Sequence, residues 1–146
     1  MEYYNLNRFI EAQESDYKIA LREIKNGRKQ SHWMWYIFPQ LKGLGKSHNS
    51  DFYGINDISE AKAYLANPLL EERVIKIAGT LLDLKSNDAL DIMGTPDHYK
   101  LKSSMTLFSS VPNSNPIFTQ VLGKFFQGKM SRRTLELLNK NNKIDK

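Results

Sequence analysis

The chain has 146 residues, of which 40% are hydrophobic and 25% charged, as is typical of one globular domain with a single core. It contains no cysteine, which excludes disulfides, thiolate nucleophiles and thiolate metal sites. No apolar run is long enough to cross a bilayer, and the first residues lack the pattern of a signal peptide. We therefore expect a cytoplasmic protein without a membrane partner.

The net charge of +5 is unevenly distributed. Residues 1–119 contain fourteen basic and fourteen acidic residues, so the whole excess lies in residues 120–146. Two segments have no acid at all: residues 24–50, with five basic residues, and residues 98–135, with six. If these segments meet in space, they create a positive potential suited to an anionic ligand such as a phosphate. A solvated basic face is the alternative, and we favour it for the tail beyond Lys124.

The first predicted helix covers residues 6–24 and ends at Asn26-Gly27, a common stop signal. Its buried face is marked by residues at helical spacing: Leu6, Phe9, Ile10, Gln13, Tyr17, Ala20, Leu21 and Ile24.

Residues 28–45, RKQSHWMWYIFPQLKGLG, hold both tryptophans and no acid. The run from Trp33 to Phe38 is apolar at every position and stops at Pro39, so we expect an extended segment that is buried on all sides. Aromatic walls beside a few polar groups are typical of a ligand pocket. The expected binding residues in this block are Arg28, Lys29, Trp33, Trp35 and Gln40. The alternative is a segment that only anchors the core.

The later helices are predicted from capping residues and prolines. Asp57 and Glu60 form a capping box, and residues 51–55 before it could be extended. Asn67-Pro68, Thr95-Pro96 and Asn115-Pro116 each favour a helix start, and Gly128 favours a stop before a short helix capped by Ser131. The fold class is therefore mainly α: a single compact multi-helix domain over residues 1–146, with one extended buried aromatic segment and a basic C-terminal helix and tail at 130–146.

A second block, DHYKLKSSMT at residues 97–106, places hydroxyls beside a lysine. Lys102, Ser103 and Ser104 could cradle a phosphate or carboxylate. Serines inside helices also commonly bond back to the preceding turn, which is the alternative.

The three histidines show no metal-ligand spacing, so we expect no metal and no cofactor. His32 is the candidate general acid or base, because its ordinary pKa lies near neutrality. A histidine that only hydrogen-bonds the backbone beside a tryptophan is the alternative. We expect His32 to share one anion pocket with Lys102, Ser103 or Ser104, in which positive charge is uncompensated.

The string SHWMW-x-x-FPQL-x-GLG, the block KLKSSMTLF at 100–108 and the apolar pattern from Phe118 to Leu135 resemble the family called domain of unknown function 1810. The resemblance covers nearly the whole chain and brings no established activity with it. An acid that the family leads us to expect shortly after Gly128 is absent, since Lys129, Met130 and Ser131 stand there. Some members are labelled calpastatin, a name that we reject because calpastatins are long and disordered.

The end of the chain, LGKFFQGKMSRRTLELL, is distantly similar to the NADAR, or YbiA-like, N-glycosidase superfamily. That similarity implies ADP-ribose or N-glycosidic chemistry. Three functions remain open. The first is a small-molecule enzyme or binding protein with an aromatic, cationic pocket for a nucleotide, ADP-ribose or another phosphorylated metabolite. The second is nucleic-acid binding through the aromatics and the basic tail. The third is a protein-interaction module without chemistry.

Overall fold

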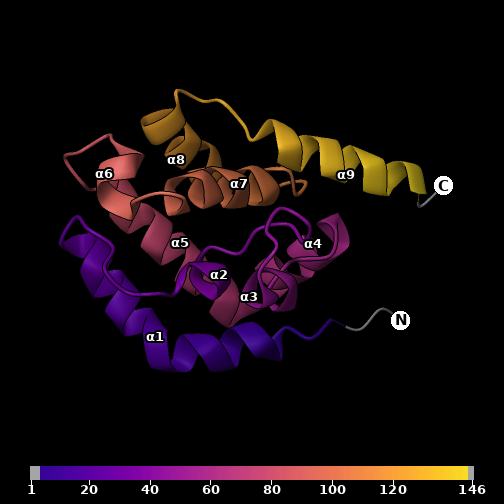
Figure 1. The fold of residues 1–146 in the computed structure, drawn as a ribbon, viewed down its shortest axis with the longest axis horizontal. Helices are drawn as coiled ribbons and strands as arrows, with labels where there is room; N and C mark the ends of the chain where they lie inside the picture. The colour runs from indigo at the N-terminus through magenta and orange to yellow at the C-terminus, as the bar shows by residue number, and fades with distance from the viewer. Residues whose placement is uncertain (1–3, 145–146) are drawn as a thin grey trace.

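The structure is a computed structural model that describes residues 4–144, with side chains to residue 140. In this part of the chain the regular elements are all helices and there is no β-strand, which confirms the mainly α class (Figure 1). The helices are α1 (Asn7–Lys25), α2 (Met34–Ile37), α3 (His48–Phe52), α4 (Ile58–Ala66), α5 (Pro68–Leu82), α6 (Ala89–Met93), α7 (Asp97–Ser109), α8 (Ile117–Phe126) and α9 (Arg132–Ile144). Within these residues, no helix combines the length and hydropathy that a membrane span needs.

Helices α5 and α7 form the centre of the domain. Helix α5 packs against α1, α4 and α8, while α7 packs against α4, α6, α8 and α9. Figure 1 shows α1 along one edge of the molecule and α9 along the other, with α5 and α7 between them. Phe108 of α7 links α4 to α8. The centroid of its ring lies 5.1 Å from that of Tyr64 in α4 and 5.4 Å from that of Phe118 in α8. Burying one such ring contributes about 1.5–3 kcal/mol.

Several helix ends follow the signals in the sequence. Asp57 accepts a hydrogen bond from Glu60 N at 2.9 Å, and Asn67 accepts from Leu69 N and Leu70 N. Ile117 N donates to the Asn115 side chain, and Thr134 N donates to Ser131 Oγ. Helix α8 ends at Phe126, after which Gln127 and Gly128 both have positive φ. These bonds replace the intrahelical partners that the first turns lack.

One basic residue of the C-terminal region is structural. Lys124 Nζ donates to the carbonyls of Leu81 and Leu82 at 3.1 and 2.9 Å, and also to that of Leu84. A lysine at this position satisfies carbonyls at the end of α5 and opposes the negative end of the helix dipole. Its charge is therefore not part of a freely solvated tail.

The aromatic segment is buried as predicted, but it is not extended. Trp33 and Phe38 are each 1% exposed, while Trp35 is partly exposed. The backbone forms one helical turn, α2. The sequence pattern could not predict this turn, because a run that is apolar at every position does not distinguish a buried strand from a buried helix. Residues 51–55, which could be extended on sequence grounds, are mostly not: α3 reaches Phe52, and of these residues Ile55 pairs with Leu41 in an isolated parallel bridge.

The predicted helix start at Thr95-Pro96 is wrong in its mechanism. Helix α7 begins at Asp97 without a side-chain cap, and the Thr95-Pro96 peptide bond is cis. Asn67-Pro68, in contrast, starts α5 with the Asn67 side chain as the cap. Asp97 occupies the first turn of α7, where its carboxylate pairs with Lys29.

Candidate functional site

Glu23 of α1 holds the aromatic segment in place. Its Oε1 accepts hydrogen bonds from Gln30 N at 2.8 Å, Ser31 N at 2.9 Å and Trp33 Nε1 at 2.8 Å, and Oε2 accepts from Ser31 Oγ. Burial of the carboxyl acts to raise its pKa, but these hydrogen bonds outweigh burial and lower the pKa of Glu23 to about 2. The ionised carboxylate is therefore a fixed part of the fold at neutral pH.

A second carboxylate, that of Asp97, pairs with Lys29 of the basic segment. Lys29 Nζ lies 2.9 Å from Asp97 Oδ2 and 4.8 Å from the centroid of the Trp33 ring. Its side chain is only 7% exposed. Asp97 Oδ1 is also 3.7 Å from Lys100 Nζ, one turn further along α7. Two lysines thus share the Asp97 carboxylate, while the ionised Glu23 carboxylate lies at Trp33 Nε1, beside the ring that Lys29 contacts.

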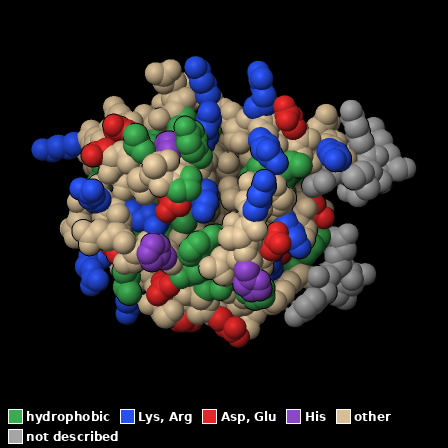
Figure 2. Space-filling model, viewed as in Figure 1, with side chains coloured by type: hydrophobic (Ala, Val, Ile, Leu, Met, Phe, Trp, Pro, Cys, Tyr) green, Lys and Arg blue, Asp and Glu red, His purple; other side chains and the backbone are tan. Residues whose placement is uncertain are grey.

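A hollow that we call the Trp35 pocket lies beside these charges. Figure 2 shows hydrophobic, basic and acidic side chains next to one another on the face that carries α2 and α3, with histidines on the same face. The pocket contains about 230 Å³ of empty space, including its part open to solvent, but only about 10 Å³ admits the centre of a water molecule. It is lined by Met34, Trp35, Phe38, Gln40, Asn49, Ser50, Tyr53, Gly54 and Lys100.

The loop of residues 42–54 supplies one wall of the pocket. Its ends meet where Lys42 N donates to Ile55 O at 2.8 Å and Ile55 N donates to Gln40 O at 3.0 Å. A loop of this length with adjoining ends is an Ω-loop, a type that is frequently functional. Helix α3 lies within it and has no fully buried residue.

Two glycines allow this loop to pack closely. A Cβ on Gly45 would lie 2.7 Å from Ser50 Cβ, and one on Gly54 would lie 2.7 Å from both Lys42 Cβ and Ser50 O. Such distances are shorter than side chains tolerate, so glycine is required at both positions. The glycine at the end of the GLG string therefore has a packing role beside the pocket wall.

Polar groups with unused hydrogen-bonding capacity surround the pocket. Trp35 Nε1 is buried and has no partner within the described residues. The amides of Gln40 and Asn49 and the hydroxyl of Tyr53 make no hydrogen bond in that part of the chain either. Lys100 Nζ lies 5.4 Å from the centroid of the Trp35 ring and only loosely against Asp97. Buried polar groups are normally paired, so the lack of a partner at Trp35 Nε1 is an exception, whereas the other four side chains are partly exposed.

Lys102 and Ser103 lie elsewhere on α7. Lys102 Nζ is 5.9 Å from the centroid of the Phe126 ring in α8. Ser103 Oγ donates to Tyr99 O at 3.1 Å and lies 3.5 Å from Ser131 Oγ, while Ser131 N donates to Thr106 Oγ1 at 2.8 Å. These hydroxyls bond back to the preceding turn and attach the start of α9, as the alternative interpretation of the block proposed.

Ser104 is fully buried and its Oγ has no partner among the described residues. It is not among the residues that line the Trp35 pocket. The hydroxyls of the second block are therefore not gathered beside Trp35.

His32 and Arg28 lie at the surface. Both side chains are exposed, and the carbonyl of His32 accepts a hydrogen bond from the Tyr36 hydroxyl at 3.3 Å. The same hydroxyl donates to Asp16, and burial raises the pKa of Tyr36 above its ordinary range, with Asp16 adding to the effect. The structure thus brings Trp35 and Gln40 together in the Trp35 pocket. Lys29 lies outside it and shares the Asp97 carboxylate with Lys100. His32, Lys102 and Ser104 do not line this pocket.

The sequence analysis missed Lys100, Asn49, Ser50 and Tyr53 as pocket residues. Lys100 carried one usable signal, since it lies three residues after Asp97 and such pairs meet on a helix. The other three come from a loop that has no periodicity, so their position depends on its closure at Leu41 and Ile55. No group of three or more potential metal-ligating side chains occurs in the described part of the chain.

The fold and the pocket define an all-α domain whose polar-lined hollow lies between α2, an Ω-loop and the first turn of α7. The chain belongs to the family described as protein of unknown function DUF1810, whose model matches residues 3–138. It is similar to the conserved hypothetical protein Rv1873 from Mycobacterium tuberculosis. The crystal structure of Rv1873 matches this chain with a TM-score of 0.91 and 41% sequence identity, and the match covers 93% of this chain and 97% of Rv1873. Among curated proteins, none matches the chain.

Proposed function

We propose that this chain binds a small phosphorylated metabolite, such as a nucleotide or ADP-ribose, in the Trp35 pocket. The observation that carries the proposal is Trp35 Nε1, which lines this hollow, is buried and has no hydrogen-bond partner within the described residues. Lys100 supplies a cation at the same place, and Trp35, Phe38 and Tyr53 supply aromatic walls. Pockets that orient a ligand combine apolar walls with a few such polar groups.

Catalysis is the second step of the proposal. The reaction that we propose is hydrolysis of an N-glycosidic or ADP-ribose-type bond, which is what the sequence resemblance of the chain end to NADAR proteins implies. Asp97 is the carboxylate nearest to the pocket cation, whereas His32 is exposed and does not line the pocket. Neither residue lines the pocket, so we propose binding before turnover and assign no residue to acid or base work.

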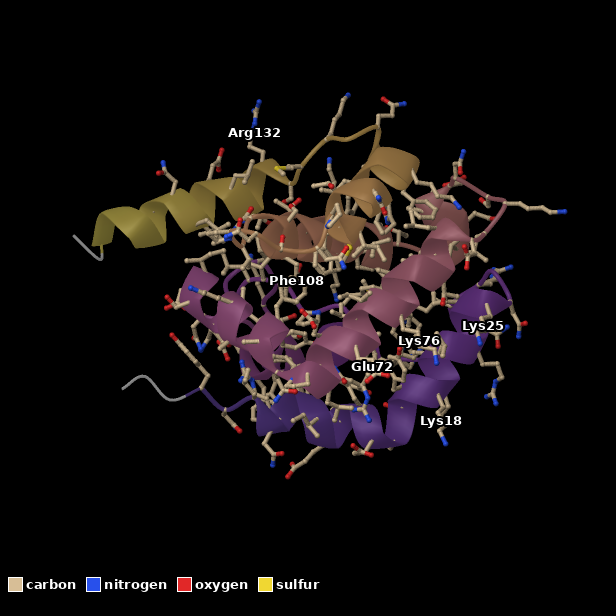
Figure 3. The ribbon with its side chains drawn as sticks, turned by 180° about the vertical axis from the view of Figure 1, so that it is seen from behind. Lys18, Lys25, Glu72, Lys76, Phe108 and Arg132 are labelled. Carbon is tan, nitrogen blue, oxygen red and sulfur yellow. The ribbon has the colours of Figure 1, made fainter. Side chains whose placement is uncertain are left out.

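Thermal unfolding with nucleotides, dinucleotides, ADP-ribose and sugar phosphates tests the binding step. A ligand at a hundred times its Kd should stabilise the domain by about 2.7 kcal/mol, which corresponds to a rise in Tm of roughly 5–10 °C. Lys100→Met should abolish most of this rise, while Lys76→Met should not. Lys76 is an exposed lysine of α5, seen from the other side in Figure 3. A rise in Tm that Lys100→Met leaves intact would place the ligand elsewhere.

One observation supports nucleic-acid binding as the second candidate function. Arg132 and Arg133 at the start of α9 are exposed, and Figure 3 shows Arg132 projecting from the helix. Changing both to glutamine should lower any affinity for single-stranded RNA and flatten its dependence on salt. Removal of the whole region is a poor test, because Thr134 and Leu138 of α9 are buried. Tight binding that survives the double change would favour a different surface.

A further inference from the structure

The Trp35 pocket contains several hydrogen-bond donors and no carboxylate. Trp35 Nε1 and the Lys100 ammonium can only donate; the first has no partner within the described residues, and the second lies 3.7 Å from Asp97. The amides of Gln40 and Asn49 and the hydroxyls of Ser50 and Tyr53 can both donate and accept. No aspartate or glutamate lines the hollow. An oxyanion can accept hydrogen bonds from all of these groups without meeting a second negative charge.

The size of the hollow limits what can enter it. Its 230 Å³ of empty space includes the part open to solvent, whereas pockets for drug-sized ligands contain about 300–1,000 Å³. Only about 10 Å³ admits the centre of a water molecule, which is room for about one water. A whole nucleotide does not fit inside; the enclosed space admits one oxygen atom of a ligand, and the rest of the group that carries it stays at the open mouth.

The face of the Trp35 ring is already occupied. Lys100 Nζ lies 5.4 Å from the ring centroid, in the position of a cation–π contact. A base that stacked on this face would have to displace the ammonium, which would then lose both the ring and its approach to Asp97. An anion placed beside Lys100 keeps these contacts and pairs with an ammonium that lies 3.7 Å from Asp97 Oδ1, beyond hydrogen-bond distance.

We infer that the pocket takes the oxyanion end of its ligand, a phosphoryl or carboxylate group, and that the remainder of the ligand stays outside, over the Ω-loop. This inference rests on the proposed function. It places the ligand's anionic group in the pocket, whereas stacking on Trp35 would place the ligand's ring there. Trp35 Nε1 and Lys100 hold the oxyanion, and the amides of Gln40 and Asn49 complete its hydrogen bonds. Asp97 acts as a positioning residue that keeps Lys100 beside the ring.

The two tryptophans allow a direct test by NMR of the indole N–H groups. Trp33 Nε1 is held by Glu23, so its signal is an internal control for the intact fold. Trp35 Nε1 is unpartnered, and its signal should shift saturably when inorganic phosphate or acetate is added. Trp35→Phe assigns the signal. The anion that binds more tightly identifies the group as phosphoryl or carboxylate.

Variants make the test specific. Lys100→Met should weaken phosphate or acetate binding about tenfold or more, because charge-assisted hydrogen bonds are the strong ones. Lys76→Met is the matched control for the lost charge and should leave the affinity unchanged. Lys100→Gln serves if the methionine variant disturbs the Trp33 signal. Equal affinity of wild type and Lys100 variants for both anions would overturn the inference.

Adenosine and adenosine monophosphate separate the inference from the proposed function. If adenosine shifts the Trp35 signal and neither anion does, the ring enters the pocket, so the inference fails while the proposed function stands. If the monophosphate and both anions shift it and adenosine does not, the inference is supported. If none of these probes moves the signal, the Trp35 pocket is not the ligand site and both fail.

Discussion

Replacement of Glu23 by glutamine should loosen the segment that carries both tryptophans. The carboxylate accepts four hydrogen bonds from residues 30–33, and its pKa is lowered from 4.5 to about 2. Each pKa unit is worth about 1.4 kcal/mol, so ionised Glu23 contributes about 3 kcal/mol of stability at pH 7. Glu23→Gln keeps the shape of the side chain and removes the charge, so we expect a loss of about 2–3 kcal/mol.

The pH dependence of this loss follows from the direction of the shift. A carboxyl whose pKa is lower in the folded state stabilises the fold above its unfolded pKa and loses that effect as the pH falls towards the folded value. The difference between wild type and Glu23→Gln should therefore be full at pH 7 and shrink between about pH 4.5 and 2.

Urea unfolding at several pH values, followed by tryptophan fluorescence, measures the difference in the free energy of unfolding. Glu72→Gln is the control, because Glu72 is an exposed glutamate of α5 (Figure 3). It should change stability by less than about 0.5 kcal/mol. A Glu23→Gln variant as stable as wild type at pH 7, or a loss of the same size at pH 7 and pH 3, would refute the role assigned to this carboxylate.

Five further substitutions test the packing and the choice of lysine. Trp33→Ala should cost about 3–5 kcal/mol in urea melts, whereas Trp35→Ala, at a partly exposed position, should cost less; equal losses would contradict the difference in burial. Gly54→Ala should lower Tm because its Cβ meets closely packed atoms, while Gly123→Ala, in α8 with open space around it, should raise stability by up to about 1 kcal/mol. Lys102→Met should leave ligand affinity within about twofold in titration calorimetry, and a tenfold loss would restore Lys102 to the site.

The helices could be predicted from the sequence more accurately than the pocket, because helix ends depend on residues that are close together in the chain. Asp57, Asn67 and Asn115 cap the helices that follow them, since their side chains reach backbone N–H groups two or three residues away. The state of the aromatic segment could not be predicted from its pattern. Its helical turn, and its attachment to Glu23, depend on packing against α1.

The choice between Lys100 and Lys102 shows the same limit on α7. Residues 103–108 are all buried, so this helix has no single apolar stripe from which its faces could be assigned. Two lysines separated by two positions point in very different directions on a helix, and only the packing of α7 against α8 and the aromatic segment decides which of them meets Trp35.

Ser104 provides a last test of whether the hydroxyls of the second block serve a ligand or the core. Its side chain is fully buried and its Oγ has no partner within the described residues. A buried hydroxyl without a hydrogen bond costs free energy, so Ser104→Ala should leave the free energy of unfolding unchanged or raise it by up to about 1 kcal/mol. Ser103→Ala is the comparison, because Ser103 Oγ donates to Tyr99 O and its loss should be slightly destabilising. Urea melts of the two variants give the answer. If Ser104→Ala loses more than about 1 kcal/mol, its hydroxyl has a partner in solution, and a ligand or a bound water at this position of α7 becomes the better explanation.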